Sequence, residues 1–198
     1  MIQLKDITDS HLQDISEAFA DAFLAEEGVV SHSLKRNDAY QYFYLTLGEF
    51  VKCGCLYTTS ENEEGYIVFY RKDKGLPWYR ELLLTWRYFM RLSLEGLQKM
   101  LLCRNGWVDY PVYHARTVDF VDVCLVCVRR EYQHQGYLKK LLAEPFRIAD
   151  ERDIPVILDT DSDVKAAKYQ ACGMEIEKDE ILKSGIHMYT MIRRRGQS

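Results

Sequence analysis

The stretch Val128-Arg129-Arg130-Glu131-Tyr132-Gln133-His134-Gln135-Gly136-Tyr137-Leu138-Lys139-Lys140-Leu141-Leu142 decides the fold class of this chain. An apolar run from Phe120 to Val128 leads into it and is typical of a buried strand. Beyond Gly136 the apolar residues recur at helical spacing. Such a strand–loop–helix exposes backbone N–H groups at a helix N-terminus, where unpaired donors and the helix dipole favour an anion. The stretch therefore predicts a phosphate-binding loop, although most turns with a single glycine bind nothing.

Composition limits the classes of protein to consider. The 198 residues suit one domain spanning 1–198, and 47% hydrophobic with 28% charged residues is typical of a soluble globular chain. The formal net charge of −4 argues against nonspecific nucleic-acid binding. We find no signal-peptide pattern and no apolar run near the roughly 20 residues that span a bilayer. We therefore expect a cytoplasmic protein that binds neither membranes nor nucleic acids.

The six cysteines favour reduced core thiols over a metal or redox site. Cys124 and Cys127 have the spacing of half a zinc site, but both lie within the apolar strand pattern, where side chains three apart face opposite sides. No second pair completes a ligand set, so we expect no metal.

Periodicity along the chain predicts a mixed α/β sheet with helices on both faces. Alternating or apolar runs predict strands over 2–7, 56–59, 66–70, 118–128, 156–159, 174–177 and 186–192. Helical spacing predicts helices over 10–25, 37–51, 78–103, 137–152 and 164–172. Asp9 or Ser10 is a suitable N-cap for the first helix.

The segment 76–111 is predicted to be a helical insertion between two strands, broken near Gly96. Its apolar positions include Leu82, Leu83, Trp86, Phe89, Met90, Leu94, Leu97 and Leu101. We expect these side chains to be core, with the wall of a substrate pocket as the alternative.

Two motifs resemble those of a known family. Gln133-x-x-Gly136-x-Leu138 resembles the Q/R-x-x-G-x-G/A loop of the GNAT acetyltransferase superfamily, which holds the pyrophosphate of acetyl-CoA. Leu158-Asp159-Thr160, followed by Tyr169-Gln170-Ala171-Cys172-Gly173-Met174, resembles its next signature. The resemblance covers roughly residues 118–192 and implies a GNAT-like fold with a largely antiparallel mixed sheet. Two positions depart from the family loop. His134 stands where the family often has Gly, and its Cβ restricts the φ and ψ angles available there. Leu138 replaces a small residue, and its larger side chain is expected to crowd a phosphate that approaches the loop.

The resemblance also implies acetyl-CoA as the acetyl donor. The family binds the pantetheine arm and the thioester oxygen through backbone N–H groups of the central strand. Lys165 takes the place of an Asn that often touches the cofactor, and it either reaches a phosphate or is solvated. The residues expected to contact the cofactor are Val126, Cys127, Val128, Gln133, His134, Gln135, Gly136, Tyr137, Leu138 and Lys165.

Two residues are candidates for proton transfer. Asp122 lies eleven residues before Gln133, the offset at which a branch of the family carries its general base. Its alternatives are a solvent-facing Asp, its neighbour Asp119, and ordered water without a single base. Tyr169 matches the family's tyrosine near the CoA sulfur, and a phenol can donate a proton to a departing thiolate. The alternative is that Tyr169 is only a core aromatic.

The sequence thus predicts an N-acetyltransferase that moves an acetyl group from acetyl-CoA to an amine of a small molecule or peptide, as a monomer or homodimer. The alternative is a catalytically weak or inactive GNAT-fold module that senses CoA. A dinucleotide-binding oxidoreductase is disfavoured, because no G-x-G-x-x-G follows the first strand.

Overall fold

The computed structural model describes residues 1–103 and 119–194. Within them, seven strands form one sheet in the order β1-β2-β3-β4-β5-β7-β6. The strands are β1 (Ile2–Gln3), β2 (Leu56–Thr58), β3 (Gly65–Arg71), β4 (Val121–Val128), β5 (Val156–Thr160), β6 (Glu175–Ile181) and β7 (His187–Arg193). Only β4 and β5 run parallel, and every other pair is antiparallel. The predicted mixed, largely antiparallel sheet is confirmed.

One face of the sheet is covered by the N-terminal helices α1 (Asp9–Ala25), α2 (Val29–Ser33) and α3 (Arg36–Lys52). Fully buried Phe19 packs there against Phe43 of α3 and Tyr66 of β3. The N-cap of α1 is Thr8, whose side chain accepts from the His11 N–H at 3.2 Å, and not Asp9 or Ser10. The cap therefore lies one residue before the predicted position.

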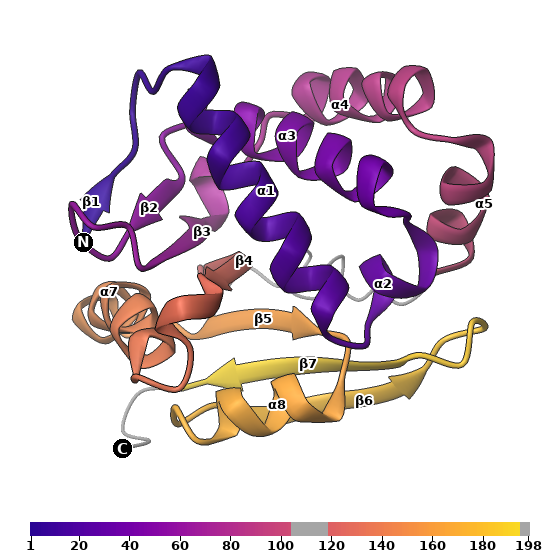
Figure 1. The fold of residues 1–198 in the computed structure, drawn as a ribbon. Coiled ribbons are helices and arrows are strands. Elements are labelled where there is room, and N and C mark those ends of the chain that lie inside the picture. The colour runs from indigo at the N-terminus through magenta and orange to yellow at the C-terminus, as the bar shows by residue number, and fades with distance from the viewer. Residues whose placement is uncertain (104–118, 195–198) are drawn as a thin grey trace.

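The other face carries α7 (Tyr137–Arg152) and α8 (Asp163–Gln170), which lie together on the lower side of Figure 1. Leu141 and Leu142 of α7 are fully buried against Val121 and Val123 of β4. The apolar residues of β3 and β4 alternate between this cluster and the one under α1 and α3. The prediction of helices on both faces is confirmed.

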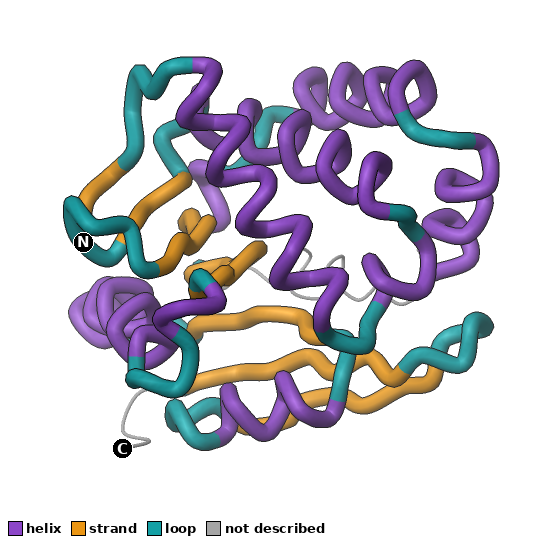
Figure 2. Tube along the Cα trace, in the orientation of Figure 1, coloured by secondary structure: helices purple, strands orange, loops and turns teal. Residues whose placement is uncertain are grey.

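Between β3 and β4 lie a short 3-10 turn, Lys72–Lys74, and the helices α4 (Trp78–Arg91) and α5 (Leu94–Cys103). Figure 2 shows a short connection between the two helices. The break comes at Ser93 and not at Gly96, since the Ser93 hydroxyl accepts from the Gly96 N–H at 3.1 Å and caps α5. Residues 104–111 of the predicted insertion lie outside the described residues, as does Val118 of the predicted strand.

The expectation that the eight apolar residues of this insertion are core was wrong for all but Leu97, which is half-buried against the cluster under α1 and α3. Leu94 and Leu101 of α5 are exposed, as are the five residues on α4. Trp86 is 61% exposed, and the other large side chains on its side of the helix are exposed as well. The opposite side of α4 contacts α3, with Leu84 as its one buried residue. No helix within the described part of the chain has the length and apolar character needed to cross a bilayer.

Candidate functional site

The central feature of the site is the point where β4 and β5 part. Their ladder joins only Val121 to Val156 and Asp122 to Ile157, whereas β4 continues to Val128. From residue 123 onward, the β4 edge that faces β5 has no ladder partner among the described residues. Free backbone groups on a strand edge bind an extended ligand as an added strand would bind. Val126, Cys127 and Val128 all lie on this stretch.

The loop that follows β4 leads directly into the N-terminus of α7. Gly136 is the N-cap residue, with a left-handed φ of 80°, and no side chain caps the helix. A Cβ built on Gly136 would meet nothing within 4 Å. The first turn of α7 has no acidic residue, and Lys139 and Lys140 are exposed there, so its first N–H groups lie beside two cations in a place that favours an anion.

The two departures from the family loop have separate outcomes. His134 adopts a left-handed φ of 61°, a conformation that Gly reaches at lower cost but that His tolerates better than most residues. Leu138 packs against the apolar cluster beneath α7, so its side chain faces the core. The larger residue at 138 therefore does not crowd the loop.

The side chains of the loop mostly shape the loop itself. Gln133 donates to the Val128 carbonyl at 3.3 Å, and Gln135 donates to the Glu131 carbonyl at 3.0 Å. The ammonium of Lys140 lies 4.1 Å from the centre of the Tyr137 ring. An anion at this loop would thus meet mainly backbone donors.

Tyr169 lies on α8, half-buried at the margin of the apolar cluster that Leu138, Val126 and Val128 also border. Its hydroxyl forms no hydrogen bond with any residue of the described ranges 1–103 and 119–194. Burial raises the pKa of Tyr169 above its ordinary value, so the phenol stays protonated at neutral pH. A half-buried, protonated and unengaged hydroxyl is suited to donate a proton.

Lys165 is neither solvated nor free. Its ammonium pairs with Asp161 at 2.7 Å and lies 5.1 Å from the centre of the Phe23 ring, and its side chain is 15% exposed. Asp161 also accepts from the Val29 N–H at 2.7 Å, and Lys168 pairs with Glu26. These contacts tie α8 to the end of α1 and the start of α2, so Lys165 acts first as a structural cation.

Asp122 does not face solvent, as one alternative held, because its side chain is completely buried. It lies opposite Tyr70 of β3 and hydrogen-bonds with Tyr70 and Cys124. Burial, with contributions from Cys124 and Asp122, raises the pKa of Tyr70 far above its ordinary value. The neighbouring Asp119 is half-buried and pairs with Arg71 at 3.0 Å.

Asp159 of β5 is a further candidate carboxyl group that the sequence analysis did not single out. Partners in a parallel ladder face the same side, so Asp122 and Ile157 share a face, and Asp159, two residues on, shares it as well. Burial raises the pKa of Asp159 to about 6, partly offset by the Thr190 hydroxyl, which donates to it at 2.8 Å. The sequence showed an Asp at a strand end within the second motif, but not its burial.

Cys124 and Cys127 do not face opposite sides, so this part of the sequence argument was wrong. The register between β3 and β4 shifts by one residue at Cys124, a bulge that brings both thiols to the face under α1 and α3. Burial raises the pKa of Cys124 well above its ordinary value and that of Cys127 to about 12. Both are therefore protonated, and neither is a ready nucleophile or metal ligand.

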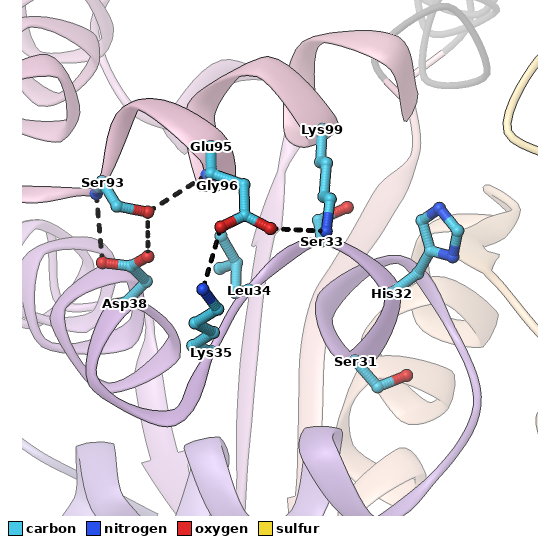
Figure 3. Close-up of a pocket in the computed structure, with 10 residues that line it drawn as sticks. All are labelled: Ser31, His32, Ser33, Leu34, Lys35, Asp38, Ser93, Glu95, Gly96 and Lys99. Atoms are coloured by element: carbon cyan, nitrogen blue, oxygen red, sulfur yellow. Dashed lines mark hydrogen bonds and ion pairs between the residues drawn. The ribbon is translucent and has the colours of Figure 1, made fainter.

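A polar pocket of about 110 Å³ lies elsewhere, between α5 and the segment where α2 leads into α3 (Figure 3). Glu95 pairs there with Lys35 and Lys99, each at 2.9 Å, while Asp38 holds Ser93 at the start of α5. None of the predicted site residues lines this pocket. Its charged groups hold α5 against α3.

Solved structures with the same arrangement identify the fold. Arylalkylamine N-acetyltransferase 2 from Aedes aegypti matches with a TM-score of 0.62 at 13% identity, covering 95% of this chain and 96% of that one. An N-acetyltransferase from Staphylococcus aureus Mu50 matches with a TM-score of 0.59 at 17% identity, covering 97% and 99%. No protein-family model and no curated protein sequence matches the chain. The chain therefore has the GNAT fold, as the two motifs predicted.

Proposed function

We propose that this protein is an acyl-CoA-dependent N-acyltransferase that moves an acetyl group from acetyl-CoA directly to an amine of a small molecule or peptide. The observation that carries the proposal is the unpaired edge of β4, which leads into the uncapped N-terminus of α7. The two structures of similar fold named above are N-acetyltransferases, one of them for arylalkylamines, which agrees with this class of reaction.

The proposed cofactor fits the residues present. The pantetheine arm would lie along the backbone of Val126 to Val128, and the pyrophosphate at the backbone of 133–138. The open space over Gly136 leaves room for phosphate oxygens. Bound there, acetyl-CoA supplies an acyl thioester, and backbone N–H groups of β4 would stabilise the charge that develops on its oxygen.

Tyr169 is the proposed proton donor. As the amine nitrogen bonds to the acetyl carbon and the carbon–sulfur bond breaks, the thiolate sulfur must gain a proton. The Tyr169 hydroxyl holds its proton at neutral pH and has no competing acceptor among the described residues. Both features support this role.

Two carboxyl groups are candidates for removing the proton of the amine. We retain Asp122 as the predicted base and add Asp159 on the same face, where a pKa of about 6 suits a base near neutral pH. Asp122→Asn and Asp159→Asn, measured separately, assign the role. The variant that has lost the base shows a larger loss of turnover at neutral pH than in alkaline solution, where the amine is already neutral.

A CoA-binding module without turnover is the second candidate. The observation that favours it is the complete burial of Asp122, because a buried carboxylate reaches the amine proton only through an intervening water. Both candidates require CoA to bind, and only the first requires thiol release.

The test combines calorimetry with a turnover assay. We expect CoA and acetyl-CoA to bind with micromolar affinity and NADH to bind far more weakly. A panel of arylalkylamines, polyamines, aminoglycosides and peptides, followed by free thiol release from acetyl-CoA, should then give an amine-dependent rate. Binding without thiol release supports the sensor, and no binding of CoA rejects both candidates.

A further inference from the structure

Helix α4 presents an apolar face that nothing in the described residues covers. Seven large side chains on it are between 41% and 72% exposed: Trp78, Tyr79, Leu82, Leu83, Trp86, Phe89 and Met90. At 3.6 residues per turn, they fall within an arc of about 140° that holds no charged residue. Scattered apolar residues on a surface need no explanation, but a contiguous face of this size marks an interaction site.

The opposite side of α4 holds the helix in this orientation. Arg80 and Arg87 reach Glu49 of α3 at 2.8 and 2.7 Å, and the Glu49 side chain is only 1% exposed. Tyr88 stacks on Tyr42 with ring centres 5.2 Å apart. Turning the apolar arc inward would take from the buried Glu49 carboxylate two of the three cations that pair with it and leave only Lys52 of α3, so the exposed face is a stable feature of the fold.

The charges of α4 favour a protein partner over a lipid surface. Helices that lie on membranes carry excess Lys and Arg on the polar side, which hold anionic lipids. In α4, Arg80 and Arg87 are paired with Glu49, while Glu81 and Arg91 have opposite signs and cancel. Protein interfaces are enriched in Trp, Tyr, Phe, Met and Arg and depleted in Lys, which matches a helix with three Arg and no Lys.

The area of the face matches one half of a homodimer. With roughly 200 Å² for a fully exposed large side chain, the seven expose on the order of 800 Å², about one partner's share of a standard interface. A two-fold axis places the same patch on both sides, so an all-apolar face meets an all-apolar face without an unpaired charge.

We propose that the protein forms a homodimer through the apolar faces of its α4 helices. Figure 1 shows α4 on the side of the molecule away from α7 and α8. The dimer thus leaves the loop 133–138 open on each subunit, and the inference does not depend on the proposed acetyl transfer.

Sedimentation velocity over a wide concentration range tests the dimer, with Leu82→Glu/Trp86→Glu as the disrupting variant. We expect a dimer for the parent, a monomer for this variant, and unchanged CoA binding. Ile181→Glu on β6 is the matched control, since Ile181 is 67% exposed but lies on another element, and it should remain dimeric. Circular dichroism checks that each variant is folded.

Two results of the sedimentation experiment would overturn the proposal. A monomer at every concentration rejects it, as does a dimer that the double substitution leaves intact. Co-sedimentation of a monomeric parent with phosphatidylcholine–phosphatidylserine vesicles would assign the face to a lipid surface instead. Blue-shifted tryptophan emission that is lost on dilution, and absent in the double variant, would support the dimer independently.

Discussion

Helices α7 and α4 have the same kind of sequence pattern, but the apolar side is buried in α7 and exposed in α4. Each has large apolar residues on one side and charged residues on the other. In α7 the apolar side packs on the sheet and buries Leu141 and Leu142 completely, whereas in α4 it faces outward. The difference teaches that periodicity identifies the apolar side of a helix but not what covers it. In α4 the contacts with α3 hold this orientation, since Arg80 and Arg87 pair with the buried Glu49 and Tyr88 stacks on Tyr42.

The largest expected effect concerns Tyr169, which borders the same apolar cluster as α7. Tyr169→Phe should leave CoA affinity and the fold nearly intact while slowing acetyl transfer by about 10² to 10⁴, the usual contribution of a positioned proton donor. The substitution keeps the ring, so packing changes little. Saturating single-turnover rates on the folded variant measure the effect.

The control for Tyr169 comes from α4. Tyr88→Phe removes a hydroxyl that bonds to Thr46 at 2.5 Å, far from the proposed loop, and should leave the transfer rate unchanged. Parent-like rates for Tyr169→Phe would return Tyr169 to a packing role. A loss near tenfold would show that water protonates the thiolate.

The next prediction tests the two faces directly. Leu141→Ala should reduce the free energy of unfolding by about 2 to 5 kcal/mol, because it removes buried methyl groups and leaves a cavity. Leu82→Ala should change it by less than about 0.5 kcal/mol at concentrations where the protein is monomeric. Denaturant unfolding measures both, and similar losses would show that the two faces do not differ. A Leu82→Ala loss that grows with protein concentration would point to α4 as an interface.

A third prediction concerns the loop before α7 and separates the effect of backbone strain from the effect of a side chain that blocks CoA. Gly136→Val should weaken CoA binding at least tenfold, about 1.4 kcal/mol, since its Cβ enters the space left for phosphate. Gly185→Val is the matched control, because Gly185 also has a left-handed φ and open space around it. Both substitutions should cost stability through strain, but only the first should change the affinity. Equal CoA affinity for Gly136→Val and the parent, measured by calorimetry, would remove the loop from the site.

The smallest expected effect concerns the half-buried carboxyl of Asp159. Its pKa of about 6 exceeds that of an unfolded Asp, about 3.9, so the folded state holds the proton more tightly and stability falls as the pH rises between these values. Asn does not titrate. Asp159→Asn should therefore gain on the order of 1 kcal/mol relative to the parent between about pH 4 and pH 7. Thermal melts of both proteins across this range measure the gain, and a difference independent of pH would contradict the raised pKa.

The sequence by itself determined the features that local patterns specify. The residues around Gly136 contain an apolar strand pattern, a glycine and apolar residues at helical spacing. The strand, the loop and the helix could therefore be predicted from residues that are close together in the chain. Gly173, which ends the turn after Tyr169, could be predicted in the same way. The fold class could be predicted as well, because it follows from the order of the predicted strands and helices. The N-cap of α1 is Thr8, one residue before the predicted position, and the ends of predicted helices usually differ by one or two residues.

Only the tertiary structure decided which of these residues are covered, paired or free. The early end of the β4–β5 ladder, the bulge at Cys124 and the burial of Asp122 each depend on strands distant in sequence. Asp159 acquires its pKa of about 6 from burial within the sheet, and α4 is held with its apolar face outward by Glu49 and Tyr42 of α3. The physical reason is common to all of them: burial and charge pairing arise from groups far apart in the chain, whereas a sequence pattern records only what lies within a few turns of helix or strand.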